Sequence, residues 1–138
     1  MQTTLTIRTK GAGLYEITAE VADWLRPAGD GLLTLFLRHT SCSLLIQENA
    51  DPSVQRDLKA YLARLVPQAD EPAMDYLTHR LEGPDDMPAH IKAALLPVSL
   101  SIPVRIGRMQ LGTWQGIYIF EHRRQPHGRQ VAAHFAPD

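Results

Sequence analysis

The sequence has only one cysteine, no surplus of either charge and no long apolar run. Because Cys42 is the only cysteine among 138 residues, an intrachain disulfide and a metal site built from thiolates alone are excluded. Fourteen Lys and Arg residues stand against fifteen Asp and Glu residues, which gives a formal net charge of −1. A nucleic-acid partner normally requires a basic field, so we expect none.

Membrane and targeting segments are also missing from the sequence. The apolar runs are far shorter than the roughly 20 residues that span a bilayer. The N-terminal segment MQTTLTIRTKG lacks the charged and apolar regions of a signal peptide. We therefore expect a cytoplasmic protein without a membrane partner. A hydrophobic content of 44% is sufficient for a single domain over residues 1–138.

Hydrophobic periodicity predicts more strands than helices. Residues 98–104, with the sequence VSLSIPV, alternate strictly, which is typical of a half-buried strand. The apolar residues at 32–38 predict a strand that is buried on both faces, and a further strand is predicted near Tyr76. The other predicted strands cover residues 4–9, 43–48, 117–122 and 130–135.

The clearest helix covers residues 53–66, where apolar side chains recur at helical spacing. Asp51 stands at its N-cap and Pro52 at its first position. Shorter helices are predicted at 19–25 and 89–96, the latter with Ile91 and Leu95 facing inward. This order of elements predicts an α+β fold with a mostly antiparallel sheet or β-sandwich and two to three helices.

Two polar segments flank the strand predicted at 43–48. His39, Thr40 and Ser41 precede it, where they form either a polar turn or a site for an anion or a metal. Glu48 and Asn49 follow it and precede a helix N-terminus, which favours anions. Asp51 competes with that use, because the simplest role for its carboxylate is to cap the helix.

Two further segments carry side chains suited to ligand binding. His79, Asp85, Asp86 and His90 lie within twelve residues, and imidazole and carboxylate groups together commonly bind divalent metals. The alternative is that an aspartate begins the second helix and the histidines are ordinary surface residues. The last segment, 111–116 (LGTWQG), offers two glycines that permit close approach of a ligand, or a tight connection around a packed Trp.

The remaining histidines and the cysteine receive simpler interpretations. His122, His127 and His134 lie in a basic segment, and we expect them to face solvent. Cys42 is expected to pack as a small buried hydrophobic residue, because a reactive thiol requires a lowered pKa.

Three segments of the chain resemble the YjbQ family, whose members are often labelled secondary thiamine-phosphate synthase. These segments are HTSCSLLIQENADPSVQRDL, EGPDDMPAHIKAALLPVSLSIPV and GRMQLGTWQGIYIFEHR, in the order and spacing of the family. The resemblance covers nearly the whole chain. It implies an α+β fold with a prominent β-sandwich and a homotrimeric assembly.

The resemblance also places the polar pocket of the family on residues of this chain. It implies a metal site made of His79, Asp86 and His90. It implies a further set of catalytic or substrate-binding residues, with Thr113 beside them: His39, Thr40, Ser41, Glu48, Asn49, Asp51 and Gln115.

The function that follows is a metal-assisted enzyme acting on a small phosphorylated or anionic metabolite. The family label implies a transferase that joins a pyrimidine pyrophosphate to a thiazole phosphate and releases pyrophosphate. A divalent metal would assist the leaving group, with Lys92 contacting phosphate oxygens. Imidazole ligands suit Zn, Ni or Fe better than Mg. The alternative function is a non-catalytic trimeric module that binds a metal or an anion.

Overall fold

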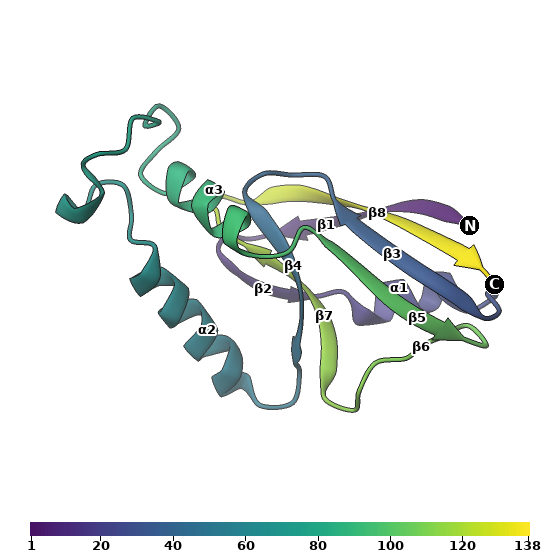
Figure 1. Ribbon diagram of the computed structural model, residues 1–138. Coiled ribbons are helices and arrows are strands. Elements are labelled where there is room, and N and C mark those ends of the chain that lie inside the picture. The colour runs from purple at the N-terminus through teal and green to yellow at the C-terminus, as the bar shows by residue number, and fades with distance from the viewer.

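The larger of two antiparallel sheets has five strands in the order β1-β8-β3-β5-β6. The computed structural model describes all 138 residues. Strands β1 (Gln2–Thr9), β8 (His127–Pro137) and β3 (Gly31–Leu37) pair along most of their length, so the two ends of the chain lie in one sheet (Figure 1). Strands β5 (Ser99–Arg105) and β6 (Arg108–Met109) complete the edge.

The smaller sheet has three strands in the order β2-β7-β4, and it carries the polar segments. It consists of β2 (Gly13–Glu16), β7 (Gln115–Glu121) and β4 (Cys42–Glu48). Helix α1 (Thr18–Leu25) joins the two sheets in one apolar core. The buried core residues come from α1, β3, β4, β5, β7 and β8, and they include Val21, Leu35, Leu44, Ile102, Ile119 and Val131.

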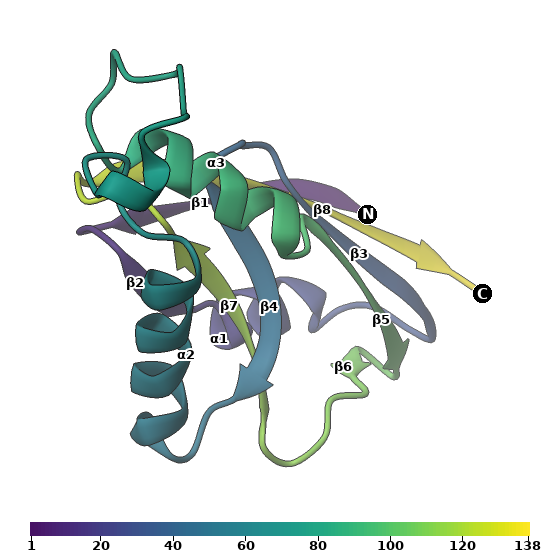
Figure 2. The same ribbon diagram turned by 60° about the vertical axis from the view of Figure 1, so that its left-hand side comes forward.

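Two helices flank β4. Helix α3 (Asp86–Leu95) lies at the beginning of β4, while α2 (Pro52–Leu65) starts beyond its end and runs back alongside it (Figures 1 and 2). The predicted cap is confirmed, since the Asp51 carboxylate accepts a hydrogen bond of 2.9 Å from the backbone N–H of Ser53. None of the helices combines the length and the apolar character needed to cross a membrane.

The predicted α+β fold with antiparallel sheets is confirmed, but three local predictions are wrong. Residues 32–38 are buried on one face only, because Leu32 and Phe36 point away from the core. A 3₁₀ helix at Pro72–Met74 replaces the strand predicted near Tyr76, whose own side chain is exposed. Leu95 does not face inward. It is the last residue of α3, and no other part of the chain covers its side chain there.

Helix α2 forms as predicted but does not bury its whole apolar row. Leu62 is buried, whereas Tyr61 and Leu65 remain 65% and 54% exposed. Helical periodicity therefore identified the helix correctly, while part of its apolar side has no partner within the chain.

Candidate metal site and its surroundings

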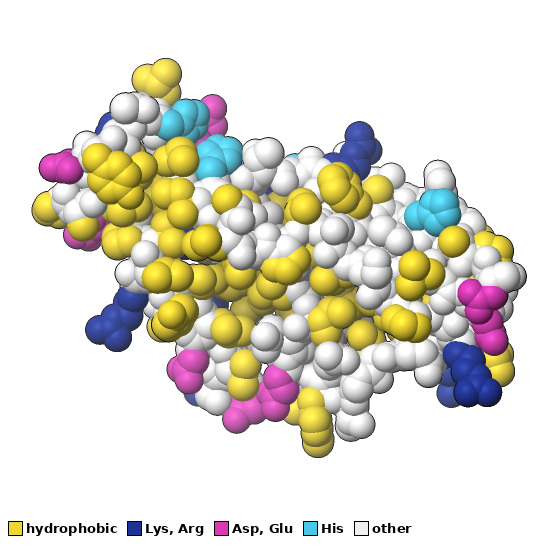
Figure 3. Space-filling view, viewed as in Figure 1, with side chains coloured by type: hydrophobic (Ala, Val, Ile, Leu, Met, Phe, Trp, Pro, Cys, Tyr) yellow, Lys and Arg dark blue, Asp and Glu magenta, His cyan; other side chains and the backbone are white.

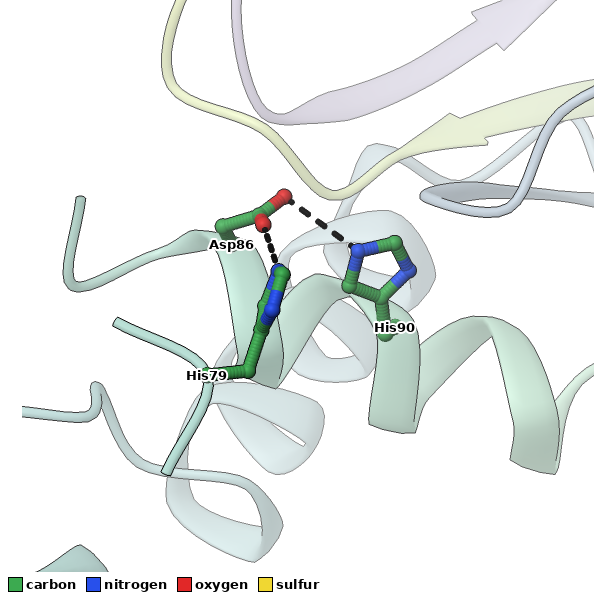
Figure 4. Close-up of side chains that lie close together, drawn as sticks. All are labelled: His79, Asp86 and His90. Carbon is green, nitrogen blue, oxygen red and sulfur yellow. Dashed lines mark hydrogen bonds and ion pairs between the residues drawn. The ribbon is translucent and has the colours of Figure 1, made fainter. Parts of the chain in front are cut away.

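Three side chains from the middle of the chain converge at the start of α3. His79 Nε2 lies 2.7 Å from Asp86 Oδ2, and His90 Nε2 lies 3.5 Å from Asp86 Oδ1 (Figure 4). The three potential ligand atoms all lie within 4.8 Å of one another. The structure thus brings together the three residues that the resemblance assigned to a metal.

Local sequence explains this convergence. Asp86 is the first residue of α3, and His90 follows one turn later on the same side of the helix. Pro88 lies within the first turn, where a missing N–H costs no helical hydrogen bond. His79 comes from the loop before the helix and meets Asp86 from the other direction.

The ring of His90 is oriented by a backbone contact. His90 Nδ1 lies 2.9 Å from the carbonyl oxygen of Thr40, so Nδ1 carries the proton and donates it to that oxygen. In the neutral ring, Nε2 then retains its lone pair on the side of Asp86. A backbone or carboxylate acceptor on the second ring nitrogen is the usual companion of a histidine that binds a metal.

Arg123 holds the two aspartates at the start of α3. Its Nη1 donates to Asp86 Oδ1 at 2.8 Å, its Nε donates to Asp85 Oδ2 at 3.0 Å, and Nη2 donates to the Glu82 carbonyl. Asp86 therefore has one oxygen held by Arg123 and the other beside His79. Sequence reasoning did not identify Arg123, because it belongs to a basic segment that was expected to face solvent.

The donor set fits a divalent metal of the Zn, Ni or Fe type. Two imidazoles and one carboxylate match the ligand preferences of these ions. Asp86 is 2% exposed, but the side chains of His79 and His90 are 49% and 32% exposed. One side of the group thus remains accessible, and three protein ligands leave a coordination position for water or substrate.

His39 and Thr40 lie next to this group, before the first residue of β4. They line a cavity of about 290 Å³ together with His90 and the end of α3. The Nε2 atom of His39 accepts a hydrogen bond of 2.8 Å from the backbone N–H of Gln130. Burial, followed by the positive charge of Arg129, lowers the pKa of His39, so its ring is neutral near pH 7.

Ser41 has a different environment, because it contacts the buried ion pair between Arg129 and Glu121. Arg129 Nη2 donates to Ser41 Oγ at 2.9 Å, and Arg129 Nε donates to Glu121 Oε1 at 2.8 Å. Thr9 donates a further hydrogen bond to Glu121. Burial alone would raise the pKa of Glu121, but the hydrogen bonds from Arg129 and Thr9 outweigh burial and lower it.

His122 does not face solvent, contrary to the prediction from the basic segment. It is 4% exposed, its Nε2 lies 2.9 Å from Ser43 Oγ, and its ring packs at a tilt against the ring of Phe120. Burial and the nearby charge of Lys92 lower the pKa of His122 to about 3. The prediction for Cys42 agrees with the structure, since the thiol lies in the core and burial raises its pKa to about 12.

The other predicted site residues lie at the opposite end of β4. Glu48 accepts a hydrogen bond from the N–H of Asp51, which itself caps α2, and Gln115 pairs with Glu48 across the sheet. Asn49 and Thr113 are exposed in the adjoining loops. Because β4 rises about 3.3 Å per residue, its span from Cys42 to Glu48 separates the two groups by roughly 20 Å. One chain therefore does not bring the two groups together.

The largest cavity of the molecule lies away from the histidines. It measures about 700 Å³ and lies between α1 and β6, where Gln115 reaches its edge. It is open and contains no histidine, whereas the smaller cavity beside His90 adjoins a group of side chains with defined chemistry.

The fold and site define an α+β protein with a histidine–aspartate group at the start of a helix that flanks a small antiparallel sheet. The chain belongs to the family described as "UPF0047 protein YjbQ-like", whose sequence model matches residues 3–138. It is 47% identical to UPF0047 protein YjbQ of Salmonella typhimurium over 135 residues, which cover 96% of this chain and 94% of that protein. It is also 47% identical to UPF0047 protein sll1880 of Synechocystis, covering 96% and 89% of the two chains.

A solved structure shows the same fold. The crystal structure of the conserved hypothetical protein TT1486 from Thermus thermophilus matches with a TM-score of 0.84 and 35% identity, covering 97% of this chain and 99% of that one. The names of these relatives state no activity.

Proposed function

We propose that this protein is a metal-dependent enzyme that acts on a small phosphorylated or anionic metabolite. The observation that carries this proposal is the convergence of His79, Asp86 and His90 with one side open, next to a cavity that His39 and Thr40 also line. A metal held only for structural reasons is usually closed by four protein ligands, whereas this group offers three.

Each residue has a distinct role in this proposal. His79, Asp86 and His90 would hold the metal, which supplies a Lewis acid for an anionic substrate or leaving group. Arg123 is a positioning residue that fixes the Asp86 carboxylate through Oδ1. The neutral ring of His39 accepts from the Gln130 N–H through Nε2, so its Nδ1–H is the donor that remains for a substrate oxygen.

Thiamine-phosphate synthase is the specific reaction that we propose to test first. In this reaction a pyrimidine pyrophosphate is joined to a thiazole phosphate, and pyrophosphate leaves with the electrons of the broken C–O bond. The support is the presence of a cation-binding group beside a cavity, which suits a pyrophosphate leaving group. The imidazole-rich ligand set favours Zn, Ni or Fe over Mg in this role.

A non-catalytic module that binds a metal or an anion is the second candidate function. It is favoured by the lining of the 290 Å³ cavity, which contains no carboxylate and no activated nucleophile. Cys42 is the only thiol there, and its raised pKa keeps it protonated. Catalysis at this position therefore depends on the metal and on His39.

We further propose that the protein is a homotrimer. Hydrophobic side chains cover the face formed by α2, α3 and β4 (Figure 3), and Tyr61, Leu65 and Leu95 are each more than half exposed. If the predicted site uses residues from both ends of β4, neighbouring chains must supply the two groups, since one chain keeps them roughly 20 Å apart. Light scattering after gel filtration should give three times the 15.4 kDa mass of the chain.

Turnover distinguishes the enzyme from the binding module. Purified protein is incubated with the two thiamine precursors, or with a panel of phosphorylated metabolites, and with Zn²⁺, Ni²⁺, Fe²⁺ or Mg²⁺, while pyrophosphate or phosphate release is measured. We expect metal-dependent release that is lost in His79→Ala and His90→Ala. The control is His134→Ala, which removes an exposed histidine on β8 that does not belong to the group. Release that persists in the first two variants would exclude this site, and no release from any substrate would favour the binding module.

A further inference from the structure

A third cavity lies on the other side of α3 from the histidine group. It measures about 180 Å³ and lies between α2, α3 and the face of the small sheet that carries Phe120. Lys92 follows His90 by two residues, so the two side chains leave the helix on nearly opposite sides. The polar residues that line this cavity are Lys59, Gln68, Asp85, Lys92, Glu121, His122 and Arg124.

Three cations at this cavity have no carboxylate partner within 4 Å. The side chains of Lys59, Lys92 and Arg124 form no ion pair and no hydrogen bond within the chain. Two carboxylates also line the cavity, but both are engaged. Asp85 accepts from Arg123 and from the Arg124 backbone, and Glu121 is held by Arg129. The uncompensated charge at this cavity is therefore positive.

The only two buried side-chain polar atoms without a hydrogen-bond partner belong to residues of this cavity. They are His122 Nδ1 and Gln68 Oε1. His122 is 4% exposed and is held through Nε2 by Ser43. When the Ser43 hydroxyl donates to Nε2, the proton of the neutral ring resides on Nδ1 and has no acceptor. Buried polar atoms are nearly always paired, so the two unsatisfied atoms favour a polar ligand at this cavity.

We propose that this cavity is an oxyanion site that binds inorganic phosphate or the phosphoryl group of a small metabolite. Lys59, Lys92 and Arg124 supply the positive charge, and the Nδ1–H of His122 supplies a neutral donor. Gln68 Oε1 is an acceptor, which suits the hydroxyl of a monoprotonated phosphate. A volume of about 180 Å³ is below the roughly 300–1,000 Å³ of sites that enclose a drug-sized molecule. The cavity therefore suits a single tetrahedral oxyanion group rather than a nucleotide.

This position also changes the role expected for Lys92. In the reaction that the family label implies, its ammonium was expected to contact phosphate oxygens beside the metal, whereas its side chain lines a separate cavity. The proposed oxyanion site does not depend on a metal at His79, Asp86 and His90, so the two can be tested independently.

Calorimetric titration of metal-free protein with inorganic phosphate, at constant ionic strength and in the presence of a chelator, tests the proposal. We expect saturable binding of one phosphate per chain. Lys92→Met and Lys59→Met should each weaken binding at least tenfold, because each removes one charge and retains an apolar stem. Lys59 lies on an exposed position of α2, so its substitution tests the site without disturbing the core. Lys10→Met is the matched control, since Lys10 is exposed and outside the cavity.

A second measurement follows the ring nitrogens of His122 by ¹⁵N NMR. Phosphate should shift the Nδ1 resonance of His122 with the same saturation curve that calorimetry gives. The same titration is repeated with glycerol 3-phosphate. Binding of glycerol 3-phosphate would show that the site accepts the phosphoryl group of a metabolite, whereas binding of inorganic phosphate alone would show that it accepts only the free ion. The proposal is overturned if wild-type protein shows no saturable binding, or if Lys92→Met and Lys59→Met bind phosphate as tightly as Lys10→Met does.

Discussion

The two ends of β4 are equally polar in sequence but are held in place by different interactions. At the beginning of β4, Ser41 contacts the buried Arg129–Glu121 pair, and Ser43 contacts the buried ring of His122. At its other end, the hydrogen bonds of Glu48 and Asp51 are solvent-exposed and serve the N-terminus of α2. A buried charged network fixes geometry more strongly than exposed hydrogen bonds do.

This difference explains why the beginning of β4 is suited to a site that requires fixed ligands. His90 is tied to Thr40 in the same segment, and Arg123 fixes Asp86. At the far end, Glu48 and Asp51 bind the backbone at the start of α2, and no buried charge holds their side chains. Substitutions at the two ends should therefore have unequal effects, and we consider them from the largest expected effect to the smallest.

Removal of the buried cation should destabilise the fold most. Arg129→Met leaves Glu121 as a fully buried carboxylate without its charged partner, and we expect a loss of about 3–5 kcal/mol in the free energy of unfolding. Urea denaturation measures this loss. The control is Arg26→Met, directly after α1, where the pair with Asp23 is exposed and should contribute less than about 1 kcal/mol. Equal losses in the two variants would show that the buried network does not hold this end of β4.

Loss of one imidazole should weaken metal binding by a large factor. His90→Ala removes one of the three proposed ligands and leaves His79 and Asp86, so we expect the Zn²⁺ affinity to fall about 100-fold or more. Competition with a fluorescent zinc chelator measures the affinity. The control is Gln115→Ala on β7, opposite Glu48 at the far end of β4, which should leave the Zn²⁺ affinity unchanged. A similar decrease in Gln115→Ala would indicate that the two ends act together, as in a site shared between subunits.

Acidification should destabilise the protein through His122. Its pKa lies at about 3 in the folded protein against 6.5 for an ordinary histidine, so the unfolded chain takes up the proton first. The neutral ring of His122 contributes fully to the free energy of unfolding above pH 6.5, and this contribution is lost progressively as the pH falls toward 3. Each pH unit in this range should lower the free energy of unfolding by about 1.4 kcal/mol.

The matched variant for this prediction is His122→Gln, which retains a polar side chain but does not titrate. The slope of the unfolding free energy against pH is measured between about pH 6 and pH 4. It should be smaller in this variant by about 1.4 kcal/mol per pH unit, which is the contribution of one proton. An unchanged slope would mean that other groups cause the acid sensitivity.

Sequence patterns predicted the architecture well where the determinants are local. Strict alternation identified β5, helical spacing identified α2, and Asp51 with Pro52 located the start of α2 within one residue. The density of histidine and aspartate, together with the family resemblance, identified the group that includes Asp86. Even the separation of His39 from Glu48 follows from the length of the strand between them.

The remaining features depend on contacts between distant parts of the chain. His122 and Arg123 belong to a run of charged and polar residues that resembles a solvated surface. His122 is bonded to Ser43, 79 residues away in sequence, and Arg123 is bonded to the two aspartates at the start of α3, 37 and 38 residues away. The exposure of Leu95 has the same origin, because helical spacing shows which residues share a face but not how far the opposing surface extends.

The smallest effect is expected for the cap at the far end of β4. Asp51→Ala removes the acceptor for the Ser53 N–H, and because the site is exposed we expect a decrease of only about 3 °C in Tm. Hydrogen bonds from Ser53 lower the pKa of Asp51, so this contribution is present above the ordinary pKa of an aspartate and is lost as the pH falls below it. Asp51→Asn is the control, since asparagine caps helices nearly as well and should retain Tm. If Asp51→Ala also reduced Zn²⁺ affinity, Asp51 would have to act beyond its own helix, and the contrast between the two ends of β4 would not hold.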